Sequence, residues 1–109
     1  MILDFERIPE SVMENFKGGE KCLSARMFTD ERNRIFKGKL AEGASIGMHR
    51  HENDCEMIYV ISGKGKIVSD EGTERIEAGQ CHYCPKGCAH SLVNDSAEDL
   101  VFFAVVAGQ

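Results

Sequence analysis

Short segments that alternate between apolar and polar residues run through the chain, and glycine-containing turns separate them. This spacing, with β-branched and aromatic residues between the turns, is typical of an all-β sandwich or barrel. The sequence predicts strands at residues 22–28, 34–40, 45–51, 55–62, 65–70, 73–77, 80–84, 89–94 and 100–107. Residues 4–15, which Pro9 interrupts, predict a short helix or an irregular arm. No later segment keeps a helical period, so we expect a small β-barrel.

The segment LVFFAVVA at residues 100–107 lacks this alternation and is apolar on both faces. A strand of this kind needs cover on both sides. One face can serve the barrel core, but the sequence predicts no layer of helices for the other. We therefore expect a homodimer that buries the outer face of one sheet. The alternative is a monomer that leaves some valine and phenylalanine exposed.

Length and composition limit the classes of function. The 109 residues fit one domain spanning residues 1–109. The formal net charge is −5 and the basic residues are scattered, so we expect no nucleic-acid partner and no attraction to anionic lipid. The chain starts without a signal-peptide pattern and has no apolar run near the roughly 20 residues of a membrane helix. We therefore expect a cytoplasmic protein with no membrane partner, and its five cysteines as thiols.

The stretch HRHENDCE at residues 49–56 has the composition of a metal site. Side chains at i and i+2 of a strand point to the same face, so His49 and His51 should project together. Glu56 follows a turn expected at residues 53–54. We expect it on a neighbouring antiparallel strand, opposite the two histidines. Such nitrogen and oxygen donors suit manganese, iron, cobalt, nickel, copper or zinc and leave coordination positions open.

A longer pattern surrounds this stretch. Residues 43–63 read GASIGMHRHENDCEMIYVISG: Gly, five residues, His-x-His, four residues, Glu, six residues, Gly. After fifteen more residues, positions 79–94 read GQCHYCPKGCAHSLVN: Gly, five residues, Pro-x-Gly, two residues, His, three residues, Asn. These two blocks resemble the paired motifs of the cupin superfamily at every defining position. One departure is Gln80, where many cupins have aspartate.

The resemblance implies an all-β fold, the cupin-type double-stranded β-helix or jelly-roll barrel. It also implies a divalent transition metal as cofactor. The residues that would hold it are His49, His51, Glu56 and His90. Pro85 and Gly87 would turn the chain so that His90 re-enters the barrel, and glycines at strand ends would mark turns of the backbone. Those strand-end glycines are Gly43, Gly63 and Gly79.

The second block is rich in cysteine and contains the remaining histidine, His82. The spacing of Cys81, Cys84 and Cys88 would suit a zinc knuckle. However, the odd separation of Cys81 and Cys84 makes their side chains diverge on a straight strand. We therefore expect small buried apolar residues. Cys55, beside Glu56, is either a bystander or a reactive thiol, and the sequence leaves these roles open.

A metal in such a site can act as a Lewis acid, orient oxygen ligands or activate dioxygen. Proteins similar to this pattern include dioxygenases, decarboxylases, sugar-phosphate isomerases and proteins without known activity. Our first expectation is a small metalloenzyme that acts on a small oxygenated organic substrate. The alternatives are a non-catalytic small-molecule, sugar-binding or sensor domain, and a barrel with a structural metal. Strand alternation points Tyr59 away from the pocket and lines it with Ile58 and Val60, which predicts a largely apolar pocket. The direction of Tyr83, a second candidate proton donor, stays open.

Overall fold

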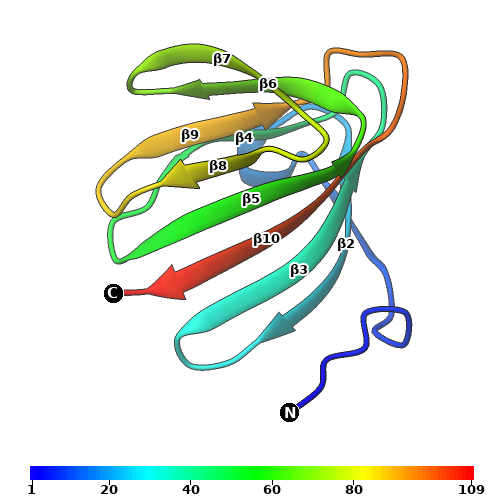
Figure 1. The fold of residues 1–109 in the computed structure, drawn as a ribbon, viewed down its shortest axis with the longest axis vertical. Helices are drawn as coiled ribbons and strands as arrows, with labels where there is room; N and C mark the ends of the chain where they lie inside the picture. Colours follow the sequence, from blue (N-terminus) through cyan, green and yellow to red (C-terminus); the bar gives the residue numbers. More distant parts are fainter.

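The computed structural model describes residues 1–109, which form ten strands and one short 3-10 helix (Figure 1). The strands are β1 (Ser11–Glu14), β2 (Cys22–Thr29), β3 (Asn33–Leu40), β4 (Ser45–Arg50), β5 (Asp54–Ser62), β6 (Lys64–Ser69), β7 (Gly72–Glu77), β8 (Cys81–Cys84), β9 (Ala89–Val93) and β10 (Leu100–Gly108). The 3-10 helix η1 spans Phe16–Gly18. Every strand expected from the hydrophobic pattern is present, with boundaries that differ by one or two residues.

Two antiparallel sheets make up the molecule. The larger sheet has the order β1-β2-β3-β10-β5-β8, and the smaller one has the order β4-β9-β6-β7. Figure 1 shows the smaller sheet lying over the larger one, with β8 at the border between them. The apolar core lies between the sheets and includes Leu23, Phe36, Ile58, Leu92 and Phe102, each at most 3% exposed. This architecture confirms the predicted all-β barrel of the cupin type.

The apolar strand β10 lies in the middle of the larger sheet, between β3 and β5. Its inward side chains, such as Phe102, are fully buried, whereas Phe103 on the outer face is half-buried. The ring of Phe5 packs edge-on against Phe103 with ring centroids 5.3 Å apart. The N-terminal arm therefore supplies part of the cover that the sequence left unassigned. The homodimer remains a prediction.

Residues 4–15 form an arm, and the alternative of a helix over these residues was wrong. The arm ends in β1, which pairs with β2, and Arg26 donates a hydrogen bond to the carbonyl of Ile8. The helical turn η1 follows and packs directly on β4. A Cβ on Gly19 or Gly47 would overlap backbone atoms of the other segment, so only glycine permits this approach.

The strand ends carry the glycines that the motif spacing predicts. Gly43, Gly63 and Gly79 all have positive φ, between 79° and 90°, which is the region that favours glycine. Gly87, with φ of 90°, turns the chain between β8 and β9 and so returns His90 to the barrel. No helix of the structure has the length and apolar composition that crossing a membrane requires.

Candidate metal centre

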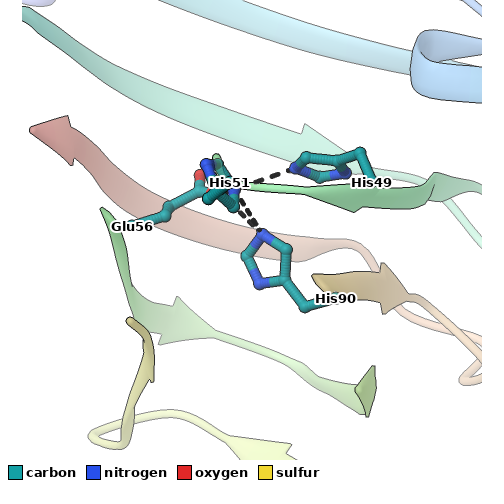
Figure 2. Close-up of side chains that lie close together, drawn as sticks. All are labelled: His49, His51, Glu56 and His90. Carbon is teal, nitrogen blue, oxygen red and sulfur yellow. Dashed lines mark hydrogen bonds and ion pairs between the residues drawn. The ribbon is translucent and has the colours of Figure 1, made fainter. Parts of the chain in front are cut away.

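The four side chains expected to hold a metal come together between the two sheets (Figure 2). His49 lies on β4 directly opposite His90 on β9, and His51 follows the last residue of β4. Glu56 comes from β5 in the other sheet. The expectation that Glu56 lies on a strand paired with the histidine strand was therefore wrong. The carboxylate reaches the imidazoles across the barrel, because β5 pairs with β8 and β10 instead of β4.

The ligand atoms of these four residues converge. All lie within 4.8 Å of one another. Glu56 Oε1 is 2.8 Å from His90 Nε2, 3.1 Å from His51 Nε2 and 3.8 Å from His49 Nε2. His51, Glu56 and His90 are 6%, 4% and 1% exposed, whereas His49 is only half-buried. The cluster is therefore closed on the core side and open on the side of His49.

Hydrogen bonds at the Nδ1 atoms fix the orientation of the three imidazole rings. Nδ1 of His49 donates to the carbonyl of Gly47 at 2.8 Å, and Nδ1 of His51 donates to Asp54 Oδ1 at 2.6 Å. These acceptors hold a proton on Nδ1 and leave Nε2 free to bind. Partners of this kind orient histidine ligands in metal sites and strengthen them.

The third imidazole has a histidine as its outer partner. His90 Nδ1 lies 3.0 Å from His82 Nε2, and when Nε2 of His90 serves as a ligand, its Nδ1–H is the donor in this pair. Burial is the main reason why the pKa of His82 is lowered, which keeps its ring neutral and able to accept. All three imidazoles therefore present Nε2 to one point.

The charge balance at this point also suits a cation. Burial by itself would raise the pKa of Glu56, but its contacts with the three imidazoles lower the pKa well below the usual range. The hydrogen bond to Glu56 raises the pKa of His51 against the effect of burial. The buried carboxylate is thus ionised and lies within hydrogen-bonding distance of Nε2 of His51 and His90. A divalent cation would balance it in the same place, so the residues present fit a transition metal.

The open side of the cluster leads into a cavity of about 420 Å³. Only four of its eighteen lining residues are hydrophobic, so the prediction of a largely apolar pocket was wrong. Ile58 and Val60 belong to the core instead of the cavity wall. The predicted outward direction of Tyr59 is confirmed, since this residue is 47% exposed. Tyr83 is exposed as well.

The cysteines take several environments, and all five are free thiols. Cys84 is buried, as expected, and burial raises its pKa to about 11, whereas Cys88 is only half-buried. Cys55 is buried as well. Cys81 is exposed, which corrects the expectation for that residue. A zinc knuckle of Cys81, Cys84 and Cys88 does not form. A different group, His82, Cys84 and His90, gathers three donor atoms but shares His90 with the main cluster.

Sequence reasoning missed three residues at this site: Asp54, His82 and Arg34. Asp54 stands three residues after His51, a spacing that could have indicated a hydrogen-bonding partner. On β8, His82 has the same strand parity as buried Cys84, which indicates an inward position. Arg34 had no local signal, because only the register between β3 and β10 places it in the cavity wall.

Known proteins with similar sequences and structures agree with this fold. An "Oxalate-binding protein" of Thermotoga maritima is 29% identical over 113 residues, covering 97% of this chain and 93% of that protein. The "Beta-alanine degradation protein BauB" of Pseudomonas aeruginosa is 32% identical over 70 residues, covering 62% of this chain and 74% of that protein.

Solved structures give the same result. The crystal structure of a predicted oxalate decarboxylase from Thermotoga maritima superposes with a TM-score of 0.92 at 26% identity, covering all of both chains. A cupin 2 conserved barrel domain protein from Salinispora arenicola has a TM-score of 0.76 at 24% identity, covering 98% of this chain and 87% of that one. Residues 36–106, more than half of the chain, match the family described as "Cupin domain". The chain therefore belongs to the cupin domain family.

Proposed function

We propose that this cupin is a metal-dependent binding protein for a small, oxygen-rich anion, with oxalate as the reference ligand. The observation that carries the proposal is the buried cluster of three imidazoles and one carboxylate, which opens on one side into a polar cavity. The sequence similarity of this chain to the oxalate-binding protein of Thermotoga maritima, over nearly the full length of both proteins, supports the choice of oxalate as ligand.

The residues of the chain have separate tasks in this proposal. His49, His51, Glu56 and His90 hold a divalent transition metal. When bound, the metal supplies a Lewis acid for oxygen atoms of the ligand. Gly47, Asp54 and His82 keep the three rings in orientation through their hydrogen bonds to Nδ1. The half-buried position of His49 leaves the approach from the cavity open.

Binding is favoured over catalysis by the position of the two tyrosines. Tyr59 and Tyr83 were the candidate proton donors for a metalloenzyme, and both are exposed on the outer face of the larger sheet. Neither lines the cavity. A small metalloenzyme of the dioxygenase, decarboxylase or isomerase type would use the same centre but would need another group to move protons.

Calorimetry on the metal-free protein tests the proposal directly. We expect stoichiometric uptake of Mn²⁺, Co²⁺, Ni²⁺ or Zn²⁺, and binding of oxalate only after metal is bound. The His51→Ala variant should lose most of its metal and its oxalate binding, whereas Tyr59→Phe, on the outer face, should keep both. Equal binding of oxalate with and without metal would contradict the proposal. Release of carbon dioxide and formate from oxalate would replace binding by decarboxylation as the function.

We also propose that two copies associate through the outer face of the larger sheet. Three half-buried apolar residues lie there on the paired strands β10 and β5: Phe103, Val105 and Met57. Exposed Tyr59 pairs with Phe103, and exposed Tyr83 pairs with Met57. The arm covers this face only in part, through Phe5 and Phe103. A cytoplasmic location and the lack of nucleic-acid and membrane partners remain predictions from the sequence.

A further inference from the structure

Arg34 shares one cross-strand row with the candidate metal ligand Glu56. Arg34 on β3 pairs with Val106 on β10, and Val106 pairs in turn with Glu56 on β5. Directly paired residues point to the same face of a sheet, so all three side chains enter the barrel. Neighbouring strands are about 4.8 Å apart, which places the Arg34 backbone roughly 10 Å from that of Glu56. Both residues line the same cavity.

The guanidinium of Arg34 has no partner in the protein. Its Nε is buried without a hydrogen bond, the only such side-chain atom of the chain, and Arg34 takes part in no ion pair. A buried polar group without a partner opposes folding, so such a group at a cavity needs an explanation. A ligand in the cavity would supply the missing acceptor.

Two aspartates of the cavity wall are already engaged, and the exposed carboxylates of Glu31 and Glu52, which also line the cavity, form no ion pair with Arg34. Asp54 accepts from His51, and Asp30 accepts from the backbone N–H groups of Arg32 and Asn33. The neighbouring cation Arg50 is held by Asp70 and by the carbonyl of Gly87. Arg34 is therefore a cation inside the cavity that is neither neutralised nor hydrogen-bonded.

We propose that Arg34 determines the ligand class by binding the outward carboxylate oxygens of a small organic anion whose other oxygens face the metal centre. This inference rests on the proposed metal-dependent binding. A guanidinium offers two parallel N–H donors that match the two oxygens of a carboxylate, a pairing that combines charge with fixed geometry. The preferred ligands are then dicarboxylates, which carry charged oxygens at both ends, and 2-oxo acids, which keep one charged carboxylate oxygen outward when the other carboxylate oxygen and the oxo group face the metal. Neutral diols and sugars would leave Arg34 unpaired and bind weakly.

The test compares two ligands on three proteins loaded with the same metal. Oxalate has outward carboxylate oxygens, whereas acetohydroxamate chelates a metal with two oxygens and has none to spare. The variants are Arg34→Gln and, as the matched control, Arg32→Gln, which removes an exposed arginine from the rim of the same cavity. Calorimetry gives both ligand affinities, and competition with a chromogenic chelator gives the metal affinity.

We expect Arg34→Gln to bind oxalate about 30-fold more weakly or worse, as when one partner of a buried charge pair is removed. Its affinities for metal and for acetohydroxamate should stay within about threefold of the original, and Arg32→Gln should change little. Equal oxalate binding by Arg34→Gln, or an equal loss in both arginine variants, would overturn the role of Arg34. Failure of the unchanged, metal-loaded protein to bind oxalate would instead reject the proposed function.

Discussion

His90 makes a contact through each of its ring nitrogens, and the two partners differ in kind. Nε2 faces Glu56 at 2.8 Å, and Nδ1 faces His82 at 3.0 Å. We expect His82→Phe to weaken metal binding about 10- to 100-fold, because a phenyl ring fills the space but accepts no hydrogen bond from Nδ1. Competition with a chromogenic chelator measures the effect. Tyr83→Phe, the exposed neighbour on β8, is the control, and equal metal affinity in both variants would contradict this role.

The convergence of the four candidate ligands could be predicted at the scale of residues, whereas the contacts of the residues around them were missed. Motif spacing predicted that His49, His51, Glu56 and His90 would come together, and the structure places them together. The positions of Arg34 and His82 depend on other strands: His82 on β8 contacts His90 on β9, and Arg34 shares a row with Glu56 through Val106. A linear pattern contains no register between distant strands, so these roles required the structure.

At the scale of elements, the close packing of η1 on β4 holds the imidazole of His49 in place through Gly47. The carbonyl of Gly47 accepts the Nδ1 hydrogen bond of His49, and a Cβ at Gly47 would overlap the backbone of Lys17. We expect Gly47→Ala to lower the free energy of unfolding by about 1–3 kcal/mol, as overpacking does. It should also weaken metal binding, because the carbonyl moves with the displaced strand.

Urea denaturation and chelator competition measure these two effects of Gly47→Ala. The control is Gly79→Ala, whose Cβ would meet open space but whose φ of 90° is unfavourable for alanine. It should lose stability while keeping its metal affinity. Unchanged metal affinity in Gly47→Ala would show that η1 supports the fold without positioning His49.

Asp70 lies in the turn between β6 and β7 and links this turn to β9 and to β4. It accepts a hydrogen bond from the Ala89 N–H at 3.0 Å at the start of β9, and it pairs with Arg50 at 3.3 Å at the end of β4. The Ala89 hydrogen bond and then Arg50 lower the pKa of Asp70 below its ordinary value of 3.8. A lowered carboxyl pKa stabilises the fold above that value, and this stability is lost as the pH falls through the lowered pKa.

We therefore expect Asp70→Asn to be less stable than the unchanged protein at pH 7, with a gap that narrows as the pH falls below 4. Chemical denaturation across that range, performed on the metal-free protein, measures the gap. Glu71→Gln, in the same turn, should show little difference from the unchanged protein. A gap that stays constant with pH would mean that the charge of Asp70 does not contribute.

The positions of the strands could be predicted from the sequence, but the pairing of the strands in sheets could not. Turn glycines and alternation located every strand from β2 to β10, because these signals are local. The short strand β1 escaped notice since only its pairing with β2 distinguishes it from the irregular arm. The sheet that contains β5 was assigned wrongly for the same reason: a short turn after His51 suggested a hairpin, whereas the chain crosses to the other sheet.

The outer face of the larger sheet gives the prediction for the whole molecule. We expect sedimentation velocity at micromolar concentration to show a dimer. Tyr59→Lys should produce a monomer, because it puts a charge in the centre of this apolar face. Met48→Lys, a similarly exposed residue of β4 in the other sheet, is the control and should remain a dimer. A purely monomeric unchanged protein would reject the interface.

The central place of β10 has a consequence for synthesis on the ribosome. This strand is translated after all the others, yet it separates β3 from β5 in the finished sheet. Until it emerges, each of those strands has an open edge, and such edges pair readily with other chains. Arg34 and Glu56 stand on the two sides of that gap, joined only through Val106. The cavity wall between Arg34 and Glu56 is therefore complete only after β10 has paired, and shielding by a chaperone would matter most just before residues 100–108 appear.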